Sequence, residues 1–213
     1  MPAQFLFDGP EDARVTIVLA HGAGAPMDSA SMNAAARALA AADFRVVRFE
    51  FGYMAARRSG ERKPPPKAET VMPEYVAAID DLGPTNGPLI IGGKSMGGRV
   101  ASMIADSEFN AKRIAGLLCL GYPFHPLGRP EQLRTKHLIG LQTPTLICQG
   151  TRDEMGNRYE VGDYGLSDAI EVLWLEDGDH DLKPRKAISG FTAAGHLKTM
   201  AEAVRNWVRQ IAP

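Results

Sequence analysis

The sequence predicts an α/β fold in which a mostly parallel sheet is covered by helices on both faces. Apolar runs of strand length alternate with segments of helical periodicity, and no repeat or low-complexity tract interrupts them. The strand-like runs are apolar at nearly every position, which is typical of parallel strands buried on both faces. A chain of 213 residues is long enough for one substantial core and short for two, so we expect a single domain over residues 1–213.

The expected elements follow one another in chain order. A buried strand at 15–20 ends in the glycine-rich turn 21–25, and Asp28 or Ser29 can cap an alanine-rich helix that reaches about residue 42. The further expected elements are strands at 44–51, 88–93, 114–120, 144–149 and 170–175, and helices over 71–82, around 100–104 and over 197–211.

Two segments fit this alternation poorly. Residues 52–67 are basic and contain a run of three prolines, and residues 122–134 follow the end of an expected strand. Each segment is either a plain loop or part of a small lid. In the second interpretation Tyr53, Met54, Phe124 and Leu127 face a substrate, and His125 is a further candidate contact.

Right-handed crossovers place the carboxyl ends of parallel strands at one edge of the sheet, where ligands bind. Residues 93–97, GKSMG, follow such a strand and match G-x-S-x-G, the turn that exposes a nucleophilic serine between a strand and a helix. A phosphate-binding loop is excluded, because its first glycine falls at Pro88. Ser95 is therefore the candidate nucleophile.

A serine hydroxyl needs a base, and histidine titrates in the right range. His180 is the best placed of five histidines, because it follows the strand at 170–175. Asp153 follows the strand at 144–149 and is the expected carboxylate partner, with Glu154 as the fallback. The chain order serine, aspartate, histidine is the order found in α/β-hydrolases.

Attack on a carbonyl creates an oxyanion that backbone N–H groups can stabilise. One expected donor is the N–H of Met96, at the start of the helix after the serine. The other is expected in the turn HGAGA, where Ala23 is the first choice and Gly24 the alternate; Gly24 is also a candidate substrate contact.

Composition and charge exclude several other classes of protein. A formal net charge of -1 gives no global field for nucleic acid, and we see neither a secretory signal nor an apolar run that would span a bilayer. Cys119 and Cys148 lack metal-ligand spacing and are expected to be buried thiols. The acidic run 177–181 fails the calcium-loop pattern. We expect a cytoplasmic protein without metal or cofactor.

Five blocks carry a family resemblance: HGAGAPMDS, GGKSMGGRVAS, LGYPFHPLG, PTLICQGTRDEMG and DGDHDLKP. With them the chain resembles the α/β-hydrolase superfamily over nearly its whole length. It is similar to the small lidless or short-lidded family of testis-expressed hydrolase-like proteins and their bacterial relatives, which are akin to dienelactone hydrolases. The resemblance implies a single-domain hydrolase without cofactor, with Ser95, Asp153 and His180 as its triad. A dienelactone hydrolase proper carries cysteine where this chain has serine, so lactone specificity is not carried over.

The leading functional hypothesis is a serine hydrolase that cleaves small carboxylic esters or thioesters through an acyl-enzyme at Ser95. A peptidase or an acyltransferase with the same site is an alternative, decided by whether water or another nucleophile receives the acyl group. A third hypothesis is a catalytically silent interaction protein. It is disfavoured because a scaffold gains no stability from holding a serine in a strained turn. A small acyl compound is the expected partner, and the oligomeric state is open.

Overall fold

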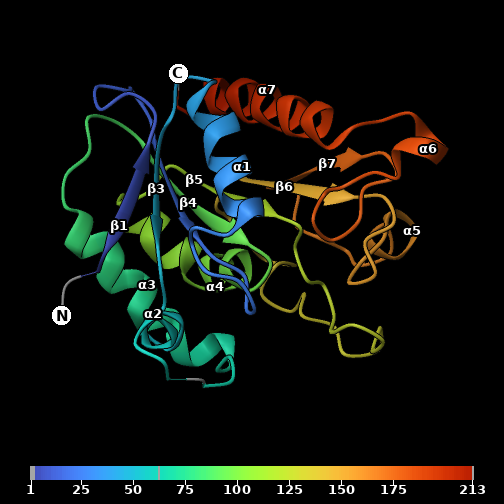
Figure 1. Cartoon of the computed structure of the whole chain (residues 1–213), viewed down its shortest axis with the longest axis horizontal. Helices are drawn as coiled ribbons and strands as arrows, with labels where there is room; N and C mark the ends of the chain where they lie inside the picture. Colours follow the sequence, from blue (N-terminus) through green and yellow to red (C-terminus); the bar gives the residue numbers. More distant parts are fainter. Residues whose placement is uncertain (1–2, 62, 213) are drawn as a thin grey trace.

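The computed structural model describes residues 3–61 and 63–212 and contains one seven-stranded sheet. The strand order is β1-β3-β2-β4-β5-β6-β7, and every neighbouring pair is parallel except β1 and β3. The strands are β1 Phe5–Asp8, β2 Thr16–Ala20, β3 Arg45–Phe49, β4 Leu89–Lys94, β5 Gly116–Leu120, β6 Thr145–Gly150 and β7 Ile170–Leu175. The mostly parallel sheet is thus confirmed (Figure 1).

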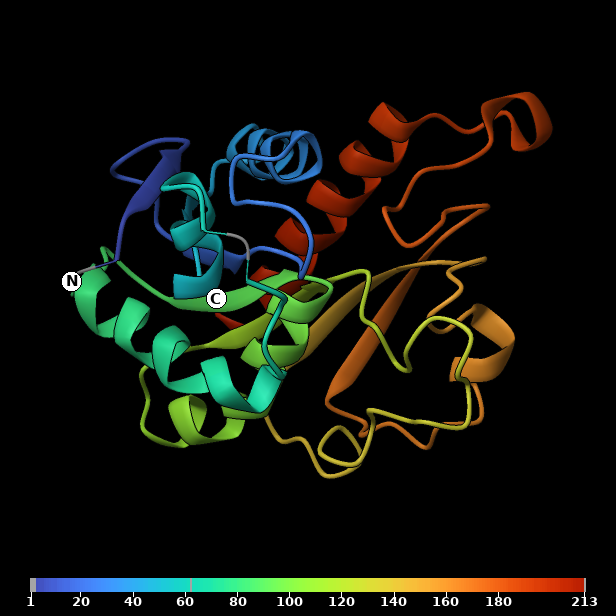
Figure 2. The same ribbon diagram turned by 60° about the horizontal axis from the view of Figure 1, so that its bottom comes forward.

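Helices cover both faces of the sheet, as Figures 1 and 2 show. The four long helices are α1 Ala30–Ala40, α3 Ala68–Leu82, α4 Met96–Asn110 and α7 Ala193–Ile211. The shorter ones are α2 Gly52–Arg58, α5 Arg158–Val161 and α6 Lys186–Ser189. Ser29 caps α1 by accepting a hydrogen bond from the N–H of Met32.

Successive strand residues point to opposite faces, so the sheet has two apolar cores. Val18, Ile91 and Leu117 pack with α3 and α4 on one side. Ile17, Ile90 and Leu118 pack with α1 and α7 on the other. Cys119 and Cys148 are buried free thiols, one in each core, as expected. The two cores fix the sheet from both sides and leave its carboxyl edge for the loops.

The structure adds elements that the pattern did not predict. The antiparallel edge strand β1 lies outside every expected element, and α2 occupies the start of the segment 52–67. Residues 122–134 form turns and bends without helix or strand. None of the described helices is long and apolar enough to cross a membrane.

Candidate active site

Ser95 sits at the sharp turn between β4 and α4, where its backbone has a φ of 52°. A non-glycine residue in this region is strained, and such strain persists only where the surroundings impose it. The surrounding glycines impose it here. A Cβ on Gly97 would lie 2.4 Å from the carbonyl oxygen of Ala20, and one on Gly93 would lie 2.7 Å from the carbonyl carbon of Gly97. Helix and strands therefore meet at backbone contact, and the serine side chain is turned outward.

Three side chains from distant parts of the chain meet at this turn. Oγ of Ser95 lies 2.8 Å from Nε2 of His180, and Nδ1 of His180 lies 2.8 Å from Oδ2 of Asp153. A carboxylate can only accept, so Nδ1 carries the imidazole proton and Nε2 is free to accept from the serine hydroxyl. The structure thus joins the three residues that the sequence selected.

The Asp153 carboxylate is fully buried and is held by several donors. The side-chain amide of Gln149 donates to Oδ2 at 2.8 Å, and the N–H of Met155 donates to Oδ1 at 2.8 Å. Together with the imidazole these donors compensate for the loss of water around a buried charge. Glu154, the fallback partner, is exposed.

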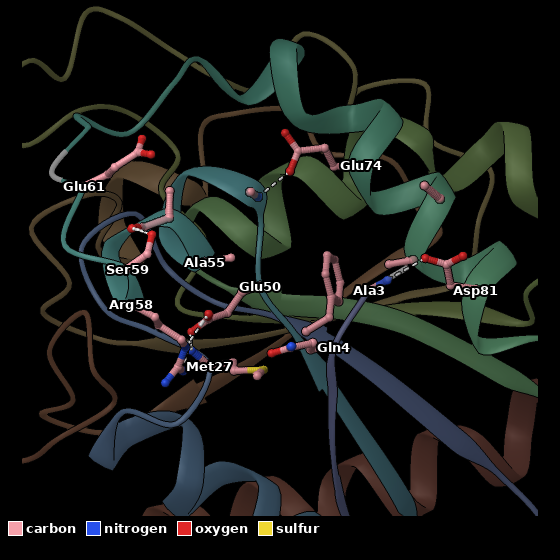
Figure 3. Close-up of a pocket in the computed structure, with 15 residues that line it drawn as sticks. Ala3, Gln4, Met27, Glu50, Ala55, Arg58, Ser59, Glu61, Glu74 and Asp81 are labelled. Carbon is pink, nitrogen blue, oxygen red and sulfur yellow. Dashed lines mark hydrogen bonds and ion pairs between the residues drawn. The ribbon is translucent and has the colours of Figure 1, made fainter. Parts of the chain in front are cut away.

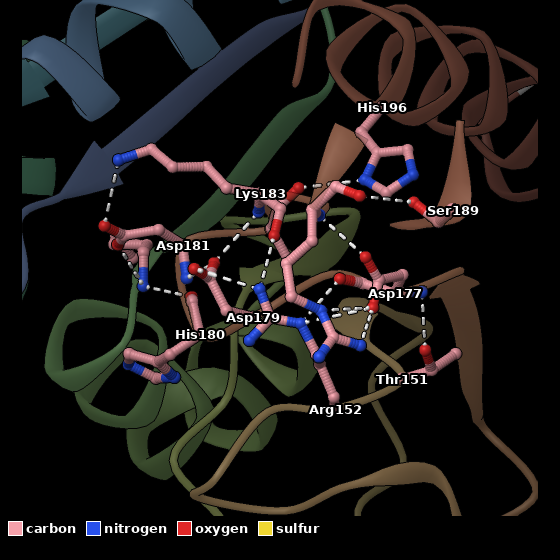
Figure 4. Close-up of polar contacts among 12 residues, drawn as sticks. Thr151, Arg152, Asp177, Asp179, His180, Asp181, Lys183, Ser189 and His196 are labelled. Atoms are coloured by element: carbon pink, nitrogen blue, oxygen red, sulfur yellow. Dashed lines mark hydrogen bonds and ion pairs between the residues drawn. The ribbon is translucent and has the colours of Figure 1, made fainter. Parts of the chain in front are cut away.

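A network of charges holds the loop that carries His180 (Figure 4). Asp177 accepts hydrogen bonds from the backbone N–H and the guanidinium of Arg185, and Arg152 donates to its carbonyl oxygen at 2.8 Å. The Arg185 guanidinium is the main reason that the pKa of Asp177 falls to about 2. Asp179 accepts from the N–H groups of Asp181 and Lys183, which closes the turn around the histidine.

The turn after β2 lies against the serine. A Cβ on Gly22 would be 3.7 Å from Cβ of Ser95. His21 fastens this turn: its Nε2 accepts from the N–H of Phe51 at 3.1 Å, so its Nδ1 donates to the carbonyl of Gly22 at 2.7 Å. Burial lowers the pKa of His21, which keeps the ring neutral and this arrangement intact. Met96 follows Ser95 directly at the start of α4, and the N–H groups of Ala23 and Met96 as oxyanion donors stay a prediction.

The side chain of Tyr53 packs against the turn after β2. Its hydroxyl donates to the carbonyl oxygen of Ala23 at 3.0 Å, and its ring packs against His21. Burial raises the pKa of Tyr53 to about 12, so the hydroxyl stays a donor at neutral pH. The sequence singled out Tyr53 as a substrate contact, and the structure shows it bonded to the loop after β2.

Two of the other candidate substrate contacts, Phe124 and His125, are buried in the protein interior. Phe124 is fully buried against Tyr122 and Tyr164, and His125 is 2% exposed, with Nδ1 placed 2.9 Å from the carbonyl of Pro126. Met54 is buried as well, whereas Leu127 is exposed. In this conformation the interior contacts of Phe124 and His125 are structural. Contact of Gly24, Phe124 or His125 with substrate stays a prediction.

A second serine and histidine pair was not anticipated. Oγ of Ser102, on the second turn of α4, lies 2.8 Å from Nε2 of His137. Ser102 also donates to the carbonyl oxygen of Arg99 at 2.7 Å and is 2% exposed. No sequence motif surrounds Ser102, and the pair forms only because the loop after residue 134 folds back over α4.

A cavity of about 810 Å³ opens elsewhere, between the residues before β1, the end of β3, α2 and α3 (Figure 3). Its carboxylates already have partners: Glu50 binds Arg58, Glu74 accepts from the N–H of Gly52, and Asp81 accepts from the N–H of Ala3. Ser95, His180 and Asp153 do not line it. We place the candidate active site at the serine, where the convergent polar groups are. In the part of the chain that the structure describes, no group of three or more metal-binding side chains gathers.

The fold is similar to solved structures of several hydrolases. A lidless α/β serine hydrolase from Xanthomonas campestris is 21% identical, with a TM-score of 0.71 over 99% of this chain and 90% of the other. A dienelactone hydrolase from Anabaena variabilis is 17% identical, with a TM-score of 0.73 over 99% and 93%. Est1E from Butyrivibrio proteoclasticus, solved with ferulic acid, is 15% identical, with a TM-score of 0.68 over 98% and 95%. Residues 13–209 match the alpha/beta hydrolase domain family, to which this chain therefore belongs.

Proposed function

We propose that this protein is a serine hydrolase that cleaves a small carboxylic ester or thioester through an acyl-enzyme at Ser95. One observation carries the proposal: two consecutive 2.8 Å contacts link the Ser95 hydroxyl through the His180 imidazole to the Asp153 carboxylate. Membership of the alpha/beta hydrolase domain family supports it.

The first half of the reaction acylates the serine. Nε2 of His180 takes the hydroxyl proton while Oγ of Ser95 attacks the substrate carbonyl carbon. Asp153 stabilises the imidazolium that forms. The N–H groups of Met96 and Ala23, with Gly24 as the alternate, are the proposed donors to the oxyanion. When the bond to the leaving group breaks, the imidazolium returns its proton to the departing alcohol or thiol.

The second half removes the acyl group. Water enters, His180 takes one of its protons, and the oxygen attacks the acyl carbonyl. Collapse of this intermediate expels Oγ of Ser95, which recovers the proton from His180. The products are a carboxylic acid and the free enzyme. No redox step or cofactor is needed for this cycle to balance.

A fluorophosphonate probe and short p-nitrophenyl esters test the proposal. The wild-type protein should react covalently with the probe and hydrolyse the esters. In Ser95→Ala, kcat should fall by about 10⁶-fold, because the residues of such a group act as a unit. A Ser95→Ala variant with unchanged circular dichroism that still takes up the probe to the wild-type extent would refute the assignment of the nucleophile.

A further inference from the structure

Lys94, the residue before the candidate nucleophile, is buried beside the histidine loop. Its side chain is 11% exposed, although lysine is rarely hidden from water. Its Nζ donates to the backbone carbonyl oxygen of His180 at 2.7 Å and lies 3.4 Å from Oδ1 of Asp181. Two consecutive residues therefore contact the same histidine. Ser95 hydrogen-bonds to its imidazole, and Lys94 hydrogen-bonds to its main-chain carbonyl.

Burying this ammonium is costly, and its partners offset the cost only in part. Burial lowers the pKa of Lys94, while the carboxylates of Asp181, Asp153 and Asp179 oppose that shift. Burial would by itself raise the pKa of Asp181, but Lys94 and Lys183 bring it below its usual range. An apolar side chain would fill this space without such a cost. The contact that an apolar side chain cannot make is the hydrogen bond to the His180 carbonyl.

The backbone leaves room for this contact at one glycine. Gly121, which follows β5, has a φ of 65°. A Cβ at this position would lie 2.5 Å from the carbonyl oxygen of His180 and 3.1 Å from Nζ of Lys94. Any side chain here would push apart the two groups that meet. A glycine between β5 and the histidine loop is thus a condition of the Lys94 contact.

We infer that Lys94 is a positioning residue whose ammonium fixes the main chain of His180, so that Nε2 stays within hydrogen-bonding distance of Oγ of Ser95. The inference rests on the proposed function. Asp153 restrains the imidazole from its far nitrogen, and the network around Asp177 restrains the start of the loop. Lys94 restrains the peptide of the histidine itself, from the strand that carries the nucleophile.

The main test compares Lys94→Met with Lys183→Met. Lys183 is the matched control, because its Nζ contacts the same Asp181 carboxylate at 3.3 Å from the solvent side and is 57% exposed. A hydrogen bond to a charged group that is lost from the transition state predicts a kcat about 10- to 100-fold lower in Lys94→Met. We expect KM to change by less than about 2-fold, and Lys183→Met to behave like the wild type. Fluorophosphonate titration supplies the concentration of active sites for each kcat.

The pH profile gives a readout that a merely structural role would not move. Below its lowered pKa, Lys94 is charged and the contact is at full strength. As the pH rises through that value, the proton is lost and kcat should fall. Burial lowers the pKa of Lys94, and the facing carboxylates that oppose this shift are Asp181, Asp153 and Asp179, beside the imidazole of His180. The fall should be absent in Lys94→Met.

Asp181→Asn keeps the test decisive if Lys94→Met fails to fold, because the Asp181 side chain is 45% exposed and tolerates the change. Without this carboxylate the alkaline fall in kcat should move to lower pH, with kcat at neutral pH within about 3-fold of the wild type. An alkaline fall that stays at the wild-type pH in Asp181→Asn refutes the inference. So does a Lys94→Met protein with wild-type kcat per titrated site.

These outcomes are separable from failure of the proposed function. If the wild-type protein neither takes up the probe nor hydrolyses esters, both proposals fall. If the wild type is labelled and Ser95→Ala is not, while Lys94→Met turns over as fast as the wild type, only the role of Lys94 is lost.

Discussion

The described part of the chain contains two serine and histidine pairs in which Oγ lies 2.8 Å from Nε2, and the two pairs differ in backbone geometry and in the direction of the hydrogen bond. Ser95 stands at a strained turn before α4, and Ser102 lies within that helix. His180 is held by a carboxylate at Nδ1, and its Nε2 faces the serine. The distance between the two side chains therefore does not make a nucleophile. We expect the candidate nucleophile to be distinguished by the direction of the hydrogen bond, in which its hydroxyl donates the proton to the imidazole.

The Ser102 pair shows the opposite direction. The Ser102 hydroxyl donates its single proton to the carbonyl of Arg99, so Nε2 of His137 must donate to Oγ of Ser102. The hydroxyl of Tyr122 lies 3.3 Å from the same nitrogen. Burial lowers the pKa of His137, and the charge of Arg99 lowers it further, so the ring stays neutral. This imidazole supports the packing of a loop on α4 and cannot take a proton from Ser102.

The largest effect is expected from a substitution that gives His180 the same imidazole tautomer as His137. In Asp153→Asn the amide can donate to Nδ1 of His180, which places the imidazole proton on Nε2, as in His137. We expect kcat to fall by about 10⁴-fold. Steady-state ester hydrolysis measures the effect. A loss below about 10-fold would mean that the carboxylate does not set the tautomer.

A smaller effect is expected at Tyr53, whose hydroxyl bonds to the turn beside Ser95. Tyr53→Phe removes the hydrogen bond to the carbonyl of Ala23 and so loosens the turn whose N–H groups we propose as oxyanion donors. Losing such a donor outright costs about 100- to 1000-fold in kcat. Loosening it should cost about 3- to 10-fold, with KM little changed. Tyr164→Phe, on a ring packed against Phe124, is the control and should keep its kcat.

The smallest catalytic effect is expected at Ser102. Ser102→Ala should keep kcat within about 2-fold and react with the fluorophosphonate probe as fast as the wild type. It should lower the free energy of unfolding by about 1–2 kcal/mol, because His137 loses a buried hydrogen-bond partner. Urea denaturation measures this loss. If the variant no longer reacted with the probe, the two pairs would not be independent.

The sequence predicted the sheet and the candidate site because both depend on local patterns. Nearly continuous apolar runs are typical of β2 and β4–β7, and residues after the ends of parallel strands must share one edge. That rule alone placed Asp153 and His180 beside Ser95. The four-residue strand β1 was not predicted, because it forms by antiparallel pairing with β3, about 40 residues further along the chain. The start of α2 was hidden in a basic segment that reads as a loop.

The burial of side chains in the loops could not be predicted from the sequence. Phe124 and His125 follow the end of β5 and read as contacts for a ligand, yet tertiary packing buries both. Lys94 is one letter of the serine motif, and nothing in the motif says where its ammonium points. The Ser102 and His137 pair joins a helix to a loop 35 residues away. Each of these depends on how surface segments fold back over the helices, which spacing along the chain does not encode.

The order of the three side chains along the polypeptide has a consequence for biosynthesis. The serine is 85 positions ahead of its base. At the usual pace of translation, about 5–20 residues per second, roughly 4–17 seconds separate the addition of the two. During that interval a nascent chain holds an alcohol with nothing to deprotonate it. Under the proposed function, the growing polypeptide cannot cleave an ester until His180 has been added.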